Sequence, residues 1–174
     1  TGFENVAIGK NALGGDVDGT ENIAIGRSAM SSTTNSRASI AIGYNALQNL
    51  NYGSLTYTHN IGIGFTAGVS ITSGIKNVII GGLAGDALTT GNNNVVMGYE
   101  ALSTEDTTGG VVAIGYRALK MQNADSTSYN TAVGYQAGEN VTTGVQNTII
   151  GGLAGDALTT GGNNVVVGYQ ALST

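Results

Sequence analysis

The sequence predicts an all-β protein, a parallel β-solenoid of ten coils of roughly 17 residues each. The first observation is a nine-residue phrase, NVAIGKNAL at its first occurrence, that returns ten times with Gly and Ala at fixed places. The second is the spacing of its central glycines, mostly 17 residues, which indicates stacked units that touch only their neighbours. The third is the combination of 29 Gly with no Pro, typical of ladders joined by tight corners. These central glycines are Gly9, Gly26, Gly43, Gly64, Gly81, Gly98, Gly115, Gly134, Gly151 and Gly168.

Each phrase contains one short strand, the three mostly apolar residues before its Gly. Side chains alternate across a strand, so the flanking residues, such as Ile23 and Ile25, face one way and the middle residue faces the other. We assign the flanking pair to the interior of the coil. The middle residues then form an apolar stripe outside, which soluble monomers rarely expose, and they predict an interface between copies. The predicted interface residues are Ala7, Ala24, Ala41, Gly62, Ile79, Val96, Ala113, Ala132, Ile149 and Val166.

The other fixed places of the phrase predict structural roles. Eight copies begin with Asn, whose stacked amides are expected to form a turn ladder from coil to coil. The Ala after the turn, as at Ala29, is small enough for a narrow interior. In some coils the next residue is Leu or Met, and the residue three places after it is mostly polar. In the other coils the next residue is Gly, and the residue three places after it is aliphatic. The two places are therefore expected to fill one void. Aromatic residues after the central Gly, such as Tyr116 and Tyr135, are expected to stack as an outer ladder.

Residues 1–174 read as a single repeat domain, and the missing initiator Met predicts a segment of a longer fibre protein. Two coils are longer than the rest, through insertions near residues 48–59 and 120–129, and these should project from the same side of the stack. The insertions carry Tyr52, Tyr57, His59 and Tyr129. Because loops on a rigid scaffold are where solenoids place recognition, these four residues are candidate receptor-binding residues.

The phrases NVAIG (Asn5–Gly9) and SIAIG (Ser39–Gly43) resemble the head repeats of trimeric autotransporter adhesins, the YadA-like head. Elements such as GYQA and TTG within Asn130–Gly144 are similar to repeats in tail-fibre proteins of phages and bacteria. The resemblance covers all ten coils, although their length exceeds the usual head repeat by a few residues. It implies a left-handed β-roll, a homotrimer with the strands turned toward a common axis, and surface attachment through a cell-surface glycan or protein receptor.

Composition disfavours several other classes of protein. Six basic against eleven acidic residues give no cationic surface for nucleic acid or an anionic membrane. No apolar stretch approaches the roughly 18 residues of a membrane helix. The absence of Cys removes thiol nucleophiles and thiolate metal sites, and no cofactor is expected. We therefore expect an extracellular structural or adhesive segment, on a cell surface or a virion tail fibre, and not an enzyme.

Three alternatives share features with the chain. Left-handed β-helix acyltransferases have a similar hexad, as in IGYRAL, but they need three hexads in each coil and a His base, whereas the single histidine here is His59. Paired threonines, such as Thr89 and Thr90, suggest an ice-binding solenoid, but they sit beside Gly at a turn. Asp16, Asp18 and Glu21 could supply oxygen ligands to calcium, yet a solvated acidic turn is the simpler interpretation.

Overall fold

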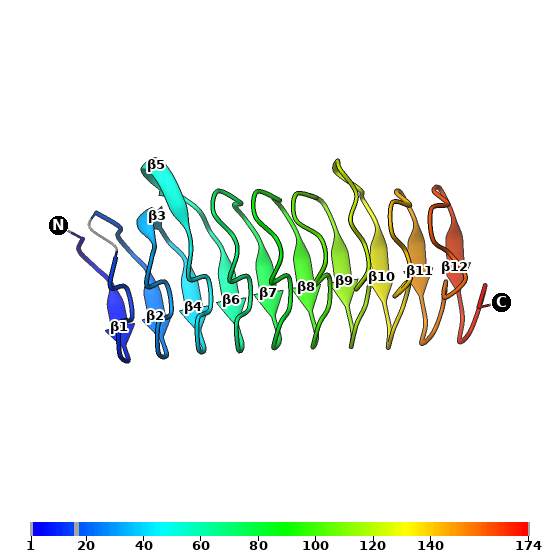
Figure 1. The fold of residues 1–174 in the computed structure, drawn as a ribbon, viewed down its shortest axis with the longest axis horizontal. Helices are drawn as coiled ribbons and strands as arrows, with labels where there is room; N and C mark the ends of the chain where they lie inside the picture. The colour runs from blue at the N-terminus through cyan, green and yellow to red at the C-terminus, as the bar shows by residue number, and fades with distance from the viewer. Residues whose placement is uncertain (1, 16–17, 174) are drawn as a thin grey trace.

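The computed structural model describes residues 2–15 and 18–173 and forms a parallel β-solenoid of about nine turns (Figure 1). This part of the chain is all-β and contains no helix. The prediction of an all-β parallel solenoid is thus confirmed. The strands are β1 (Val6–Ile8), β2 (Ile23–Ile25), β3 (Thr34–Arg37), β4 (Ile40–Ile42), β5 (Asn51–Tyr57), β6 (Ile61–Ile63), β7 (Val78–Ile80), β8 (Val95–Met97), β9 (Val112–Ile114), β10 (Thr131–Val133), β11 (Thr148–Ile150) and β12 (Val165–Val167).

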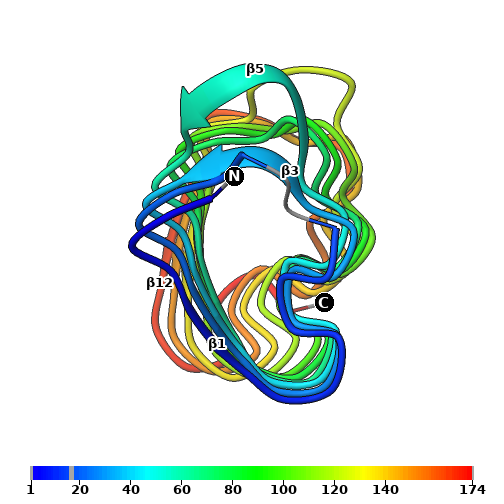
Figure 2. The same cartoon turned by 90° about the vertical axis from the view of Figure 1, so that its left-hand side faces the viewer.

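One long sheet holds the stack together. Its order is β1-β2-β4-β6-β7-β8-β9-β10-β11-β12, and every neighbouring pair is parallel. The register places equivalent residues of the phrase side by side, so that Ala24 pairs with Ala41 and Ala41 with Gly62. Seen from the end, the coils superpose around one interior (Figure 2). The repeat of the sequence is therefore also the repeat of the structure.

The assignment of the two strand faces was wrong. Ala24, Ala41, Ile79, Val96, Ala113, Ala132 and Ile149 are fully buried, Gly62 is buried and Val166 is 5% exposed. Ala7 lies in register with Ala24 but is exposed, on the terminal strand β1. The middle residues therefore point into the coil and form its core, not an interface. The flanking residues point outward and are half-buried or exposed throughout.

The physical reason is a size exchange across the interior. An ideal Cβ on Gly62 would lie 2.6 Å from Cγ of Leu47, so the middle of a strand faces the turn residue of the preceding coil. Where that turn residue is Gly68, a Cβ would lie 3.1 Å from Cδ1 of Ile79. A large turn residue thus precedes a small middle residue and Gly precedes a large one. This pairing is possible only if both side chains fill the same space.

The expected exchange within each turn is confirmed. A Cβ on Gly68 would lie 3.0 Å from Cδ1 of Ile71, the aliphatic residue three places later. The alanines after the turns, including Ala29, Ala84 and Ala137, are fully buried in the same core cluster. The core is therefore a single column, in which most coils supply one strand residue, one alanine and one larger aliphatic side chain. The coil after β4 is an exception, because Leu47 and Leu50 are both fully buried.

The asparagine ladder is also confirmed. Asn77 is buried, its Oδ1 accepts from the backbone N–H of Asn94 at 3.0 Å, and its Nδ2 donates to the carbonyl of Gly91 at 2.9 Å. The same bonds recur from Asn60 to Asn77 and from Asn130 to Asn147. Each amide therefore satisfies backbone groups at a corner that the sheet ladder does not reach.

Both insertions project from the same side of the stack, as predicted (Figures 1 and 2). In the first insertion, β5 pairs in parallel with β3 and forms a second, two-stranded sheet. The second insertion remains a loop between β9 and β10. These two raised segments carry the four candidate receptor-binding residues.

Candidate functional site

The prediction that Tyr52 is a receptor-binding residue was wrong, because Tyr52 is buried and has a structural role. Its side chain is only 7% exposed, and its hydroxyl donates to the carbonyl of Gly74 at 2.6 Å. Asn60 Nδ2 in turn donates to the Tyr52 hydroxyl at 3.3 Å. Because both partners belong to the regular coils, Tyr52 anchors the inserted strand β5 to the stack.

Burial raises the pKa of Tyr52 from 10.0 to about 12, although the Asn60 hydrogen bond partly offsets this effect. The unfolded chain ionises this phenol at the ordinary pKa, so the stability it contributes is complete below pH 10 and is lost as the pH rises toward 12. We expect the tyrosinate absorbance of the wild type minus that of Tyr52→Phe to rise with a midpoint near pH 12. A midpoint near pH 10 in the folded protein would show that Tyr52 is accessible.

Tyr57 and His59 do lie together on the surface. Tyr57 is 50% exposed, its ring stacks on His59 with the centroids 5.7 Å apart, and Arg37 Cζ lies 5.0 Å from the Tyr57 centroid. Parallel pairing of β3 and β5 brings Arg37 beside Tyr57. The group forms a cationic aromatic ridge on the first insertion. Within the described chain, His59 has no carboxylate partner of the kind a catalytic base requires.

Tyr129 lines a cavity of about 270 Å³, which we call the Tyr129 cavity. Asn92, Asn93, Thr107, Thr127 and Tyr129 surround it over the backbone of Gly109 and Gly110. Tyr129 is 63% exposed and the residues around it are uncharged. The walls therefore combine amides, hydroxyls and one aromatic ring. Sequence reasoning predicted Tyr129 but missed the other residues. Thr127 lies on the same insertion, whereas Asn92, Asn93 and Thr107 belong to two regular coils that only the stacking brings beside it.

A buried polar network supports this cavity from the inside. Glu105 is fully buried, and its Oε1 accepts the backbone N–H groups of residues 106, 107 and 108 at 3.1, 3.2 and 3.1 Å. Its Oε2 accepts from Gln122 Nε2 at 3.3 Å and from the N–H of Ala124 at 2.9 Å. Gln122 also donates to Ser128 Oγ at 2.8 Å, directly before Tyr129 in the chain. The network thus ties the second insertion to the coil that carries Thr107.

Glu105 and Gln122 were not predicted as parts of a site. The available signal was a polar residue at a place where other coils have Leu88 or Val141. A fully buried carboxylate that replaces an aliphatic residue requires partners, and here the partners are the turn and the inserted loop.

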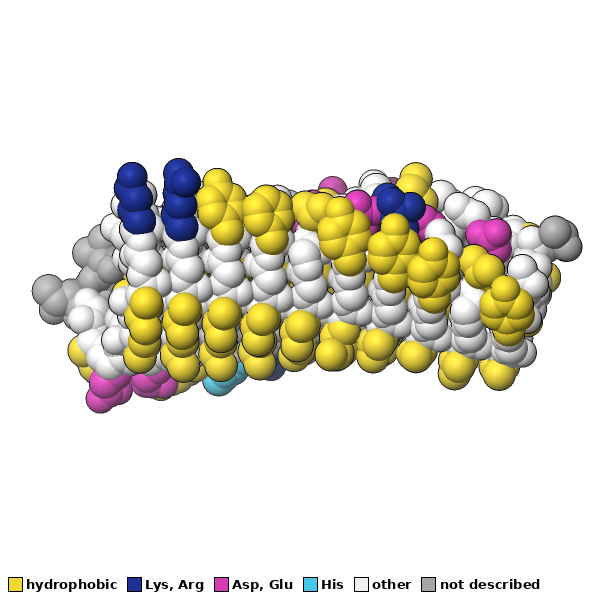
Figure 3. Space-filling model, turned by 90° about the horizontal axis from the view of Figure 1, so that it is seen from below, with side chains coloured by type: hydrophobic (Ala, Val, Ile, Leu, Met, Phe, Trp, Pro, Cys, Tyr) yellow, Lys and Arg dark blue, Asp and Glu magenta, His cyan; other side chains and the backbone are white. Residues whose placement is uncertain are grey.

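The predicted aromatic ladder is confirmed beside the outer strand face (Figure 3). Tyr44 stacks on Phe65 at 5.3 Å, and Tyr116 stacks on Tyr99 at 5.9 Å and on Tyr135 at 5.2 Å. Each ring directly follows a central glycine, and the parallel register therefore places the rings of successive coils side by side. Contacts between the faces of these nearly parallel rings stabilise the stack and leave the ring edges exposed.

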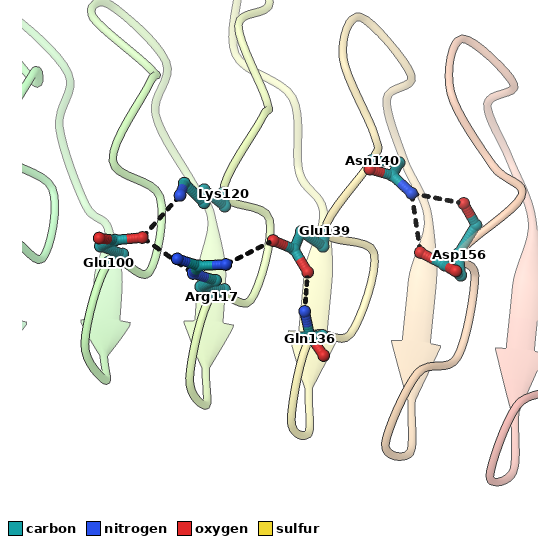
Figure 4. A network of polar contacts seen from close by, with 7 residues as sticks. All are labelled: Glu100, Arg117, Lys120, Gln136, Glu139, Asn140 and Asp156. Atoms are coloured by element: carbon teal, nitrogen blue, oxygen red, sulfur yellow. Dashed lines mark hydrogen bonds and ion pairs between the residues drawn. The ribbon is translucent and has the colours of Figure 1, made fainter.

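Ion pairs also join successive coils (Figure 4). Glu100 Oε2 accepts from Arg117 Nε at 2.9 Å and from Lys120 Nζ at 2.6 Å, and Arg117 Nη1 lies 3.7 Å from Glu139 Oε1. The hydrogen bond from Lys120 lowers the pKa of Glu100. The opposite charges are paired across neighbouring coils, so this network is a surface connection and not a reactive cluster.

Two alternatives remain to be compared with the structure, an ice-binding surface of paired threonines and a calcium site. Thr89 Oγ1 donates to the carbonyl of Asp106 at 2.8 Å, and Thr142 Oγ1 to that of Thr159 at 3.2 Å, so these hydroxyls join coils at a turn. Of the three residues considered for calcium, Asp16 lies outside the described residues. In residues 2–15 and 18–173, no group of three or more His, Asp or Glu side chains is placed to hold a metal ion.

In the described ranges there is no helix with the length and apolarity needed to span a bilayer.

Comparison with protein-family models, characterised proteins and solved structures finds no match for this chain. The class of protein is therefore defined by the fold itself, a parallel β-solenoid. Its candidate functional surface is the side that carries both insertions, with the Tyr129 cavity at one of them.

Proposed function

We propose that this chain is a structural and adhesive segment of a trimeric extracellular fibre, either a phage tail fibre or a bacterial surface adhesin, that supports attachment to a host or surface. In this proposal the ten coils form a left-handed β-roll, three copies pack about a common axis, and the chain has no enzymatic role. The insertions face outward and present contacts to a glycan or protein receptor.

The observation that carries the proposal is the outer strand face, formed by the first and third residues of each strand of the long sheet. All but two of these residues are aliphatic or Met, Thr131 and Thr148 being the polar ones, and none is fully buried. An apolar row runs the length of the molecule (Figure 3). So long an apolar surface is unusual on a soluble monomer and favours an interface between proteins.

The partner that fits this face best is another copy of the same chain. Parallel strands repeat at about 4.8 Å, and the side chains of the outer face repeat with them. A surface can match that period over the whole length only if it has the same period, which an identical solenoid has. Cyclic assembly is the usual closure for identical subunits, and the resemblance to trimeric fibre repeats selects three copies.

The interface is tested by two charged substitutions on adjacent coils, Ile63→Lys with Ile80→Lys. Both side chains lie on the outer strand face, where an unpaired buried ammonium would be strongly unfavourable. We expect the solution mass, measured by analytical ultracentrifugation, to fall from three times 17.4 kDa to 17.4 kDa.

The matched control is Ser73→Lys with Thr90→Lys, which places the same two charges one coil apart on exposed turn residues. This control should keep the trimer mass. A wild-type mass of 17.4 kDa would refute the trimer. Binding of acetyl-CoA would instead favour an acyltransferase, and thermal hysteresis would favour an ice-binding solenoid.

A further inference from the structure

We propose that the Tyr129 cavity binds one neutral sugar residue of a glycan, stacked against the Tyr129 ring and hydrogen-bonded by Asn92, Asn93, Thr107 and Thr127. This inference rests on the proposed fibre function, because it names the chemical class of the receptor. It concerns a site at the second insertion, lined by residues other than those of the outer strand face.

The cavity exists because two side chains are missing from the stack. The residues two places before each strand form a row along the solenoid, in which Lys76, Asn93, Gly110, Tyr129 and Gln146 follow one another. Gly110 interrupts this row, and Gly109 leaves the neighbouring place without a side chain as well. An ideal Cβ on Gly110 would lie 3.0 Å from Cδ1 of Tyr129. The exposed ring thus borders a space one coil wide.

The chemistry of the walls fits a sugar. A pyranose presents hydroxyl groups around its edge and C–H groups on its face, so it needs hydrogen-bonding side chains beside a flat apolar surface. Tyr129 supplies the surface. Asn92 Oδ1 already accepts from the N–H of Ile75 at 2.7 Å, which fixes the side chain and leaves its amide N–H donors for a ligand. The side chains of Asn93, Thr107 and Thr127 make no hydrogen bond within the described chain.

Size and charge narrow the ligand further. A volume of about 270 Å³ is just below the ~300–1,000 Å³ of typical small-molecule sites and suits a single ring. Among the residues that the structure describes, no charged side chain lines the cavity, and Asp106 and Asp125 are exposed close in sequence to Thr107 and Thr127. These carboxylates disfavour sialylated or sulfated sugars and nucleic acid, and favour a neutral hexose or N-acetylhexosamine.

The site is held in place before any ligand arrives. Ser128 donates its N–H to Thr108 Oγ1 at 3.2 Å, and the N–H of Gln146 donates to the Ser128 carbonyl at 2.7 Å, so the backbone beside Tyr129 is fixed on two sides. Glu105 fixes the Thr107 turn through its three backbone hydrogen bonds. Preorganised walls lower the entropy lost on binding, which compensates for the small contact area.

The test uses the 174-residue chain on an array of neutral hexose and N-acetylhexosamine glycans together with their sialylated and sulfated forms. We expect binding to a subset of the neutral glycans. Gly110→Asn should abolish it, because Asn tolerates the φ of +70° at this position and its side chain fills the space. Tyr129→Asn, which removes the ring and keeps a residue already present at Asn93 in the same row, should weaken binding at least tenfold.

Gln146→Ala changes the same row one coil beyond the cavity and should bind as the wild type does. Thermal unfolding of each variant establishes that it is folded, and Tyr129→Asn serves if Gly110→Asn does not fold. Full binding by both variants, binding confined to acidic glycans, or binding to a peptide partner with none to glycans would overturn the inference. A trimer that binds no neutral glycan would overturn the cavity proposal alone, whereas a monomer that still binds glycan would overturn the fibre proposal alone.

Discussion

Replacing Gly81 by alanine is expected to lower the free energy of unfolding by about 4 kcal/mol, from backbone strain of ~1–3 kcal/mol and overpacking of similar size. Gly81 has φ +135°, which L side chains rarely adopt, and its added Cβ would lie 2.5 Å from the carbonyl oxygen of Gly98 on the next coil. The coils that carry Gly81 and Gly98 would have to move apart. Urea unfolding followed by circular dichroism measures the loss, and hydrogen exchange should show new opening at β7 and β8.

Gly82→Ala is the matched control. Gly82 follows directly in the chain, and a Cβ there would approach only the Tyr99 ring, at 3.5 Å. Other coils carry an aromatic residue at this place, so alanine should change stability by less than about 1 kcal/mol. Equal losses from the two substitutions would contradict the role assigned to the central glycines.

Replacing Glu105 by alanine is expected to destabilise the protein by about 4 kcal/mol, because buried donors left without an acceptor each lose ~1–3 kcal/mol. The substitution removes the acceptor of three turn N–H groups, of Gln122 Nε2 and of the Ala124 N–H. Local disorder should concentrate in residues 105–129, around the Tyr129 cavity. Urea unfolding and hydrogen exchange of that segment measure the two effects.

Two further variants distinguish the effect of the buried Glu105 hydrogen bonds on stability from the effect of removing a negative charge. Glu105→Gln keeps one carbonyl oxygen for the turn and should lose about half as much, since charge-assisted hydrogen bonds are roughly twice as strong as neutral ones. Asp106→Ala removes the neighbouring exposed carboxylate and should change stability by less than about 0.5 kcal/mol. If Asp106→Ala is as harmful as Glu105→Ala, the buried network does not hold the insertion.

Much of the fold could be predicted because each coil repeats the same local chemistry. Asn77 and Asn94 were predicted to form a ladder, since an amide at a fixed place in eight of the ten coils can stack on the next one. Gly68 and Ile71 were predicted to share one void because their sizes vary together. The aromatic ladder at Tyr116 and Tyr135 follows from the same reasoning.

The candidate site was predicted only in part. Tyr57, His59 and Tyr129 are exposed on the insertions, as expected, but Tyr52 is buried beneath the first of them. Aromatic character alone does not distinguish an anchor from a contact residue, because Tyr suits both. The difference is made by Gly74 and Asn60, which lie on other coils and accept or donate at the Tyr52 hydroxyl.

The sequence by itself determined the coil, its period, its ladders and the side on which the insertions project, because these depend on local alternation and on the identity of stacked residues. Only the tertiary structure decided which strand face is internal and which residues surround Tyr129. Alternation separates two apolar faces without saying which is inside, and that depends on the turn residue opposite. Leu47 against Gly62 and Gly68 against Ile79 carried this information in the chain. These pairs identify the inner face only once it is known that the two residues of each pair pack against each other, and only the stacking of the coils brings them together.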